Sequence, residues 1–391
     1  MPDLKIAVIG AGVGGLVAAI ALQNRGHRVQ IFERSAVPRT SGSGISLFGN
    51  ALKALAAVEL GDLLAEGDME HARMSEAGQR KPDGSWLMKL PANSTKNLTV
   101  LPRTELHKRL IRRLKPGTLV LGTEALVESS ENGILMLSRA GQEPANEQYD
   151  LIIAADGLRS GSRKALGIDP GLRYAGYTAW RGMTVGDNDY GDIGGATWGR
   201  GEHFGYSPML GGGSYWFATA TVPEHHQVRG NRIELMRRFK RWHEPIRQII
   251  EDTPENNLIR HDIYALRKPL KRFTSGRVLL LGDAAHGMTP DLGQGACQAI
   301  EDAATIANLI GPSSNSINTN LALRRYDKLR RGYTTRVSRR SWLVGKMGQN
   351  PSPVFVRFRD VGMRLFPQKL FALMMRNLHS FQKPKSVGKA S

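Results

Sequence analysis

The stretch that most constrains the fold is the glycine-rich segment Gly10-x-Gly12-x-x-Gly15, which joins an apolar run to an Ala/Leu-rich segment. Residues 6–9 have the length of a buried strand, and helical composition begins at about Val13. In such a strand–turn–helix unit the first glycine permits the tight turn, and the second lets the backbone approach a pyrophosphate. The third lets the helix pack closely on the strand. The segment therefore predicts a Rossmann-like nucleotide site.

A second apolar run, residues 29–32, ends at Glu33, eighteen residues after Gly15. A carboxylate at this distance can accept hydrogen bonds from an adenosine ribose, while the helix N-terminus offers N–H groups to the phosphates. A glycine triplet alone is weak evidence, because glycine-rich turns also occur for structural reasons. The strand, the helix and the acid in this order favour the nucleotide interpretation.

Composition sets the broad class of the protein. The 391 residues suffice for two domains, or for one large domain with an inserted layer, and 41% hydrophobic with 23% charged residues is typical of a soluble globular protein. The single cysteine, Cys297, excludes an internal disulfide, favours a reducing compartment and suits a small core residue. Without a signal-peptide pattern or an apolar run of roughly 18 residues, we expect a cytoplasmic protein. No ligand spacing predicts a metal site.

The positive charge is concentrated near the C-terminus. The formal net charge is +19, and residues 324–391 hold 17 Lys and Arg against two Asp. Most of the positive charge therefore lies in this segment. Such a charge indicates which binding partners the protein could attract rather than which fold it adopts.

The pattern along the chain predicts an α/β protein with a Rossmann-like parallel sheet, an inserted antiparallel β-sheet domain and C-terminal helices. Aromatic and β-branched runs broken by glycine between residues 173 and 223 indicate the insertion. We expect strands at 119–121, 134–137 and 151–154, and helices at 50–57, 60–65, 101–114 (capped by Thr104), 232–241, 245–251 and 296–310. A long basic helix, a break at "QNPSPV", one final helix and a disordered tail follow.

Two further stretches narrow the class of nucleotide. "LIIAADGLRSGSR" places Asp156-Gly157 after an apolar strand, and "VLLLGDAAHGMTPDLGQGACQAIEDA" holds Gly282-Asp283 and a glycine-rich helix start. With "LPRTEL" and "GSGISLFGNALKAL", this set resembles the single-component (group A) FAD-dependent aromatic hydroxylases, of the para-hydroxybenzoate hydroxylase type, from about residue 4 to residue 340. "RYAGYTAWRG" and "GQGACQAIEDA" are most similar to the urate hydroxylase and zeaxanthin epoxidase branches.

The resemblance implies bound FAD, with NAD(P)H as reductant and no separate nicotinamide domain. Asp283 would accept from the flavin ribityl hydroxyls, and the helix start near Gly293 would direct N–H groups at the flavin edge that gains negative charge on reduction. Asp-Gly is also a common turn, and an Asp after a strand often caps a helix. The expected cofactor-binding residues are Gly10, Gly12, Val13, Gly14, Gly15, Glu33, Arg34, Gly44, Ile45, Arg103, Leu126, Asp156, Gly157, Gly282, Asp283, Pro290, Gly293, Gln294, Gly295 and Ala296.

The family's chemistry implies that reduced flavin and O2 form a C4a-hydroperoxyflavin, which delivers one oxygen atom to an electron-rich carbon while the protein excludes solvent. Tyr215, His203, Arg181 and Pro290 are the catalytic candidates. "SYWFAT" is similar to a strand that faces the flavin, and His203 could deprotonate or orient a substrate hydroxyl. His286 is expected to be structural. Aromatic residues of the inserted sheet either line the pocket or form a packing face: Tyr177, Trp180, Tyr206 and Trp216.

Three functions stay open at this point: hydroxylation of an aromatic or heteroaromatic small molecule, epoxidation or another oxygenation of a lipophilic substrate, and flavin binding without oxygenase activity. The domain boundaries expected are 1–70, 99–168 and 271–312 for the FAD-binding domain, 71–98 and 169–270 for the substrate-binding sheet, and 313–391 for the basic helical segment. That segment either packs on the FAD domain or lies on the inner face of an anionic membrane. No nucleic-acid motif accompanies its charge.

Overall fold

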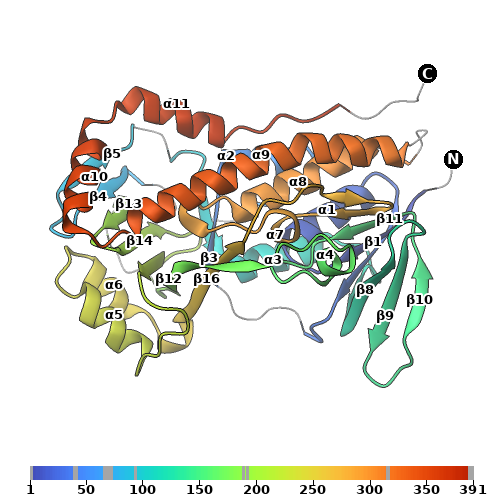
Figure 1. The fold of residues 1–391 in the computed structure, drawn as a ribbon, viewed down its shortest axis with the longest axis horizontal. Coiled ribbons are helices and arrows are strands. Elements are labelled where there is room, and N and C mark those ends of the chain that lie inside the picture. The colour runs from blue at the N-terminus through green and yellow to red at the C-terminus, as the bar shows by residue number, and fades with distance from the viewer. Residues whose placement is uncertain are drawn as a thin grey trace.

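The computed structural model describes residues 3–37, 43–64, 74–91, 95–186, 190, 193–313 and 318–385. Two large sheets dominate it, and the C-terminal helices run along both of them (Figure 1). The mixed architecture of a parallel sheet, a separate antiparallel sheet and C-terminal helices confirms the predicted fold class.

The first sheet has six strands in the order β17-β18-β11-β1-β2-β7. All its strand pairs are parallel except the short edge strand β17 with β18. Parallel strands are buried on both faces and so appear as continuous apolar runs; Ile6, Ala7 and Val8 of β1 are fully buried. The strands are β1 (Lys5–Ile9), β2 (Arg28–Glu33), β7 (Leu119–Leu121), β11 (Leu151–Ala154), β17 (Thr274–Ser275) and β18 (Val278–Leu280).

The second sheet has seven strands in the order β16-β12-β15-β14-β13-β4-β5, antiparallel except where β13 meets β4. Its side chains alternate between two faces. One face buries Trp180, Phe204 and Trp216 against α5 (Asn231–Phe239) and α6 (Ile246–Asp252), and the other lines a cavity. The strands are β4 (Glu76–Arg80), β5 (Trp86–Lys89), β12 (Leu172–Met183), β13 (Ile193–Trp198), β14 (Glu202–Pro208), β15 (Ser214–Ala220) and β16 (Ile259–Leu266).

Smaller elements connect the two sheets. Two further sheets are made of β8 (Thr123–Ser129), β9 (Ile134–Arg139) and β10 (Ala145–Gln148), and of β3 (Gly44–Leu47) and β6 (Thr99–Pro102). The helices of this part are α1 (Val13–Gln23), α2 (Gly49–Ala56), α3 (Arg103–Arg112), α4 (Gly161–Ala165), α7 (Asp283–His286) and α8 (Gly295–Ile310).

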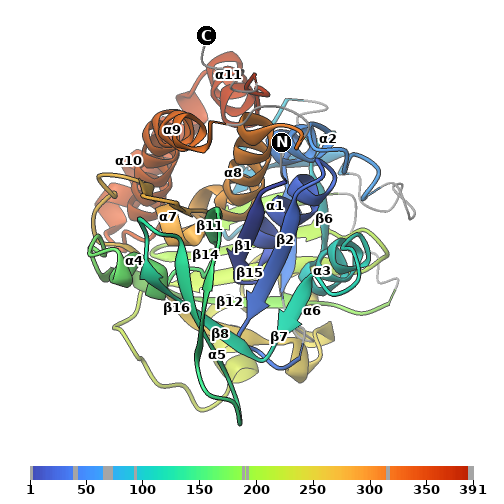
Figure 2. The same cartoon turned by 90° about the vertical axis from the view of Figure 1, so that its right-hand side faces the viewer.

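The C-terminal segment forms α9 (Thr319–Gly348), α10 (Pro353–Leu365) and α11 (Gln368–Leu378). At 1.5 Å per residue α9 is about 45 Å long, and it passes alongside α8 and on toward the second sheet (Figures 1 and 2). Helices α10 and α11 then lie at the outer corner of the molecule, where α10 packs on β5. The segment therefore packs on both halves of the protein.

Three local predictions were wrong. Residues 61–64 form turns rather than a helix, because their hydrogen bonds close only a single turn, and residue 65 lies outside the described part. Helix α3 begins at Arg103, so Thr104 lies inside it and Pro102 is the N-cap residue, without a side-chain cap. The final helix is two helices, because Pro367 restricts the preceding residue and has no N–H to continue α10. The predicted disordered tail from residue 386 onward also lies outside the described residues.

Candidate functional site

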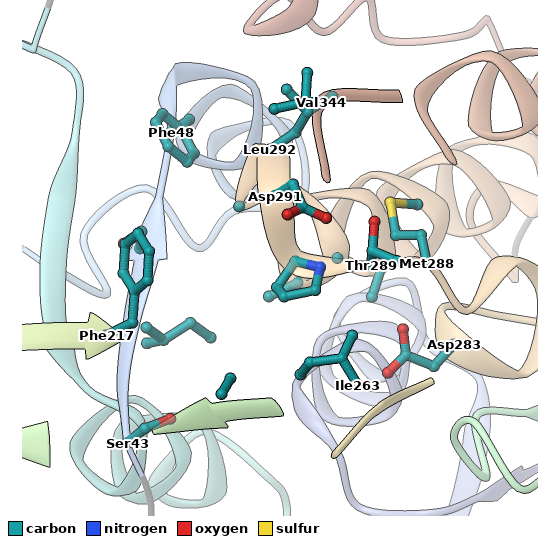
Figure 3. Close-up of a pocket in the computed structure, with 18 of the residues that line it drawn as sticks. Ser43, Phe48, Phe217, Ile263, Asp283, Met288, Thr289, Asp291, Leu292 and Val344 are labelled. Carbon is teal, nitrogen blue, oxygen red and sulfur yellow. The ribbon is translucent and has the colours of Figure 1, made fainter. Parts of the chain in front are cut away.

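A cavity of about 2050 Å³ lies between the first sheet and the second. This volume is about twice the upper end of the range for a pocket that holds one drug-sized ligand. Figure 3 shows Phe217 on one side of the cavity and Asp283, Met288 and Thr289 on the opposite side. The cavity therefore has room for a cofactor and a second molecule.

The glycine-rich turn after β1 forms the first wall of the cavity. Gly10 has φ of +97°, and a Cβ there would lie 2.6 Å from the carbonyl oxygen of Ala155. A Cβ at Gly15 would lie 2.2 Å from the Gly10 oxygen, so the third glycine permits the close packing of α1. No described protein atom lies within 4 Å of a Cβ built at Gly12, which lines the cavity. The turn thus presents bare backbone to a ligand.

Glu33 stands beside this turn, at the end of β2. Its Oε2 accepts a hydrogen bond from Ala11 N at 3.0 Å, and its Oε1 accepts one from Ser35 N at 3.0 Å. These bonds fix the carboxylate at the cavity wall and leave lone pairs for a ribose hydroxyl. Arg34 and Arg103 line the same cavity.

The Asp156-Gly157 turn forms a second wall, after β11. Asp156 Oδ2 accepts from Ser162 N at 2.9 Å, while its buried Oδ1 has no hydrogen-bond partner among the described residues. Gly157 has φ of +80° and faces open space. Behind the turn, the buried Arg163 donates to Asp169 at 2.7 Å and to the carbonyl oxygen of Ala284 at 3.0 Å. The turn is held rigidly and offers an unsatisfied acceptor to a ligand.

The third wall is made by the ends of β18 and α8. Asp283 follows Gly282, whose φ is +63°, and reaches the cavity (Figure 3). Gly293 adopts the left-handed conformation and approaches Phe48, and α8 then begins at Gly295. This helix has no acidic residue in its first turn and no side-chain cap. Its first N–H groups are therefore free for an electron-rich ligand edge.

The other expected cofactor residues are also in the cavity lining, with one exception. Gln294 is buried, and its side chain turns away from the cavity: Oε1 accepts from Asn50 Nδ2 at 2.9 Å and from Gln298 Nε2 at 3.2 Å. It supports the loop from behind. The residues that do line the cavity include Val13, Gly14, Ile45, Leu126, Pro290 and Ala296.

A buried charged network holds this third wall in place. Arg330 of α9 donates to Asp302 Oδ1 and to Glu301 Oε2, both at 2.6 Å. Asp302 Oδ2 also accepts from Gly282 N at 3.0 Å and lies 2.7 Å from His286 Nε2. Burial opposes ionisation of Asp302, but His286 and Arg330 outweigh it and hold the pKa of Asp302 below its usual value. His286 is absent from the described cavity lining. The network connects α8 and α9 to the turn at Gly282 and Asp283.

The walls fit a flavin dinucleotide. The glycines present open backbone, the Asp156 Oδ1 atom lacks a partner, and the N-terminus of α8 carries free N–H groups. These are the features that a pyrophosphate, a ribityl chain and the electron-rich edge of an isoalloxazine ring require.

The second sheet forms the floor of the cavity. Neighbouring strands place Arg181, Phe217, Gly205 and Ala196 side by side in one row. A Cβ at Gly205 would lie 2.4 Å from Cε1 of Phe217, so this glycine lets the Phe217 ring lie across the sheet. The next row along the strands holds His261, Ala179, Thr219, His203 and Trp198.

All four catalytic candidates line the cavity: Tyr215, His203, Arg181 and Pro290. Tyr215 packs on β3, since a Cβ at Gly44 would lie 2.4 Å from its Cγ, and burial raises its pKa. Burial and then the charge of Arg359 lower the pKa of His203 to about 3. His203 is therefore neutral near pH 7 and suited to orienting a substrate hydroxyl rather than deprotonating it.

Arg181 carries a charge into the cavity. Its guanidinium makes no ion pair or hydrogen bond with the residues that the structure describes. Its positive charge adds to burial in lowering the pKa of His261 to about 4. An unpaired cation at a cavity floor is suited to an anionic or strongly polar oxygen of a ligand.

Two of the four expected aromatic candidates face away from the cavity. Trp180 and Trp216 face α5 and α6, because side chains alternate along a strand and these two occupy even positions. Tyr177 is absent from the described lining, but its hydroxyl donates to Oδ2 of the lining residue Asp291 at 2.8 Å. Tyr206 borders the cavity and also packs in the buried cluster of Trp180 and Trp216.

Sequence reasoning missed several residues of the cavity. Asp291 and His261 line it, and burial raises the pKa of Asp291. The position of Asp291 between Pro290 and Gly293 could have indicated it. The apolar lining from the C-terminal helices had no sequence signal, and it includes Leu343, Val344, Met347, Phe355, Met363, Phe366, Phe371 and Met375.

A Rossmann-like sheet with a glycine cradle, sharing one cavity with an inserted antiparallel sheet, defines the class of FAD-dependent hydroxylases. A model of the FAD binding domain family matches residues 3–341, and the chain belongs to this family.

Full-length relatives narrow the class further. Aurachin C monooxygenase/isomerase of Stigmatella aurantiaca is 34% identical over 384 residues, which cover 96% of this chain and 98% of that protein. 2-heptyl-3-hydroxy-4(1H)-quinolone synthase of Pseudomonas aeruginosa is 29% identical over 376 residues, 93% of this chain and 94% of that protein. The crystal structure of Klebsiella pneumoniae HpxO complexed with FAD and uric acid shares the fold, with a TM-score of 0.85 at 24% identity and 96% coverage of both chains.

The urate hydroxylase and zeaxanthin epoxidase branches are also among the relatives. The predicted family is confirmed, and the protein is an FAD-dependent monooxygenase, for which NAD(P)H is the usual reductant of the family. In the part of the chain that the structure describes, no helix is both long and apolar enough to cross a bilayer.

Proposed function

We propose that this monooxygenase hydroxylates a heteroaromatic ring that carries a long apolar substituent. The observation that carries the proposal is the composition of the cavity lining. The lining from α9, α10 and α11 consists mainly of Leu, Val, Met and Phe side chains, with Arg340, Arg359 and Arg376 among them. A relative named for a heptyl-substituted hydroxyquinolone supports this substrate class.

The polar residues of the floor would hold the ring. Arg181 offers an unpaired guanidinium to a ring oxygen, and stabilising the deprotonated form of that oxygen would enrich the neighbouring ring carbon in electrons. His203, which is neutral because its pKa is about 3, would orient a second polar group. Tyr215 lies between β3 and the floor and would separate the ring from bulk water.

The cofactor would be held by the residues whose backbone or side chains line the three walls. When bound, FAD supplies the electrons and the activated oxygen for the hydroxylation. The Asp291–Tyr177 hydrogen bond of 2.8 Å holds the loop before Gly293 in place. Pro290 precedes this pair and stiffens the same loop.

We also propose the domain division expected from the sequence. All six strands of the first sheet fall within residues 1–70, 99–168 and 271–312, and all seven of the second fall within 71–98 and 169–270. Residues 313–391 add the C-terminal helices. The buried, unpaired Cys297 supports a cytoplasmic location, since a reducing compartment preserves free thiols.

A chain-length series tests the function. The FAD-loaded protein is supplied with 4-quinolones bearing 2-alkyl chains of increasing length, and with phenols and urate as short controls, while NADH or NADPH oxidation and product mass are followed. Each methylene buried in the apolar lining is worth about 0.8 kcal/mol. We therefore expect KM to fall about fourfold per methylene, with a product heavier by one oxygen atom.

Two results would contradict the proposal. If KM does not change with the length of the alkyl chain, the substrate does not need a long apolar substituent. Reductant oxidation that substrates fail to accelerate, with no oxygenated product, would favour a flavin-binding protein without oxygenase activity. The site of oxygen insertion in the product separates hydroxylation from epoxidation.

A further inference from the structure

The outer surface of α10 and α11 is unusually apolar. Val354, Phe358, Val361 and Leu365 are exposed by 66%, 74%, 48% and 77%, and their spacing of four, three and four residues places them on one face of α10. Nine of the thirteen exposed large hydrophobic residues in the described part of the chain fall between residues 343 and 374. Exposed apolar side chains gathered in one segment in this way indicate an interaction surface. The other exposed residues of this group are Leu343, Met347, Leu370, Leu373 and Met374. Four of the nine, Leu343, Met347, Phe358 and Met374, also line the cavity.

The same surface carries positive charge. Arg357 and Arg364 are exposed beside the apolar stripe of α10, and Lys369 and Arg376 are exposed on α11. Asp360 is the only acidic residue from 328 to the C-terminus, and it is paired with Arg359 at 2.8 Å. An apolar face edged by Lys and Arg is the signature of a helix that lies in the interface of an anionic bilayer.

The inner faces of these helices are attached to the protein. Arg359 donates to the carbonyl oxygen of Gly199 at 3.0 Å, and the His379 ring stacks on Phe48 with 4.4 Å between centroids. Phe355 and Phe371 line the cavity from the inner side. Helices α10 and α11 therefore border the cavity and also carry exposed apolar side chains that no described residue covers.

We propose that the outer surface of α10 and α11, with the end of α9, lies on an anionic lipid bilayer, and that the substrate enters the cavity between these helices from the lipid. A second copy of the chain is a poorer occupant, because the contact would set two basic surfaces against each other. The proposed lipid contact is inferred only from the exposed apolar and basic residues of this surface. The substrate route rests on the proposed function.

Vesicle flotation tests the lipid contact with the full-length, FAD-loaded protein. The probes are vesicles of phosphatidylglycerol with phosphatidylcholine, and vesicles of phosphatidylcholine alone. We expect flotation with the anionic vesicles, little with the neutral ones, and release as salt rises from about 0.1 M to about 1 M, where the Debye length falls from about 10 Å to about 3 Å.

Two variants separate the apolar and charged contributions. The triple variant V354S/V361S/L365S should lower the partition coefficient at least tenfold, and I233S, which removes another exposed apolar residue (66%), should not. R357Q/R364Q should lower it roughly 25-fold, about fivefold per charge, while K240Q/R241Q on the far side of the second sheet should leave it unchanged. FAD content and thermal midpoint verify that each variant is folded.

Wild-type protein that fails to float with anionic vesicles overturns the proposal, whatever the variants do. Equal flotation of the wild type and the triple variant also overturns it. A concentration-dependent dimer in light scattering that the triple variant abolishes would assign the surface to a contact between copies instead. Anionic vesicles that speed the turnover of a long-chain quinolone, but not that of a short-chain one, would support the substrate route. If neither quinolone is turned over at all, the proposed function is wrong, while the lipid contact is unaffected.

Discussion

The buried network around Arg330 makes a quantitative prediction for the variant R330Q. The Arg330 side chain is 6% exposed, and its partners Glu301 and Asp302 are 2% and 0% exposed. Removing the cation leaves the buried Glu301 without a charged partner and Asp302 with His286 as its one remaining described ion-pair partner. Breaking a buried ion pair in this way costs about 3–5 kcal/mol. At about 1.2 °C per kcal/mol for a chain of this size, the thermal midpoint should fall by about 4–6 °C.

The neighbouring residue supplies a matched control. Arg331 pairs with Asp327 at 3.1 Å, but the two side chains are 40% and 18% exposed. A pair this exposed is worth about 0–1 kcal/mol, so R331Q should shift the midpoint by no more than about 1 °C. Scanning fluorimetry of both variants with and without added FAD measures the difference.

The loss in R330Q should also depend on pH. In the wild type, burial raises the pKa of Glu301, and Arg330 is the largest influence that opposes this rise. Without Arg330 the pKa values of Glu301 and Asp302 in the folded protein both rise. A carboxyl group whose pKa is higher in the folded than in the unfolded protein makes the folded protein less stable as the pH increases and the group ionises. The deficit should therefore be smaller at pH 5 than at pH 7.5. Equal deficits in R330Q and R331Q, or a deficit that does not change with pH, would refute the role assigned to the network.

The remaining predictions concern the cofactor and the substrate. FAD should be bound without a covalent link, so acid precipitation should release all the yellow colour into the supernatant; colour kept in the pellet would contradict this. Gly12→Val should abolish FAD binding, because its side chain would project into the cavity, and Asp283→Ala should weaken it about 10- to 100-fold, the worth of a charge-assisted hydrogen bond. FAD titration measures both, and wild-type affinity in both variants would reject the assignment. Arg181→Met should raise KM for substrates with an acidic ring hydroxyl more than for neutral analogues; an equal rise for both would exclude the ion pair.

The cofactor half of the protein could be predicted because its signals are local. Strands 119–121 and 151–154 match the structure to the residue, since buried parallel strands are short apolar runs bounded by turns. The conformations of Gly10 and Gly15 follow from contacts within a few residues of β1 and β11. Strand β8, "TEALVES", escaped prediction because its composition suits a helix equally well.

The substrate half could not be predicted in the same detail. The hydrogen bond between Tyr177 and Asp291 joins residues 114 positions apart, and His261 reaches the floor only through pairing of β16 with β12. The direction of Trp180 depends on the register of β12, where a slip of one residue exchanges the two faces. Even a correct strand prediction therefore left two of the aromatic candidates on the wrong face.

The end of α9 shows how the C-terminal segment takes part in the site. Glycine costs a helix interior about 1 kcal/mol relative to alanine, yet Gly345 and Gly348 lie in the last turns of α9. A Cβ at Gly345 would lie 2.6 Å from Asp291 Oδ2, and one at Gly348 would lie 1.9 Å from Cε1 of His203. The two glycines let α9 approach both the flavin-side loop and the polar row of the floor. The positions of Asp291 and His203 are thus determined partly by a helix that is far from either residue in sequence. For this reason the sequence motifs identify the cofactor, whereas the shape of the substrate site depends on tertiary packing that the motifs do not encode.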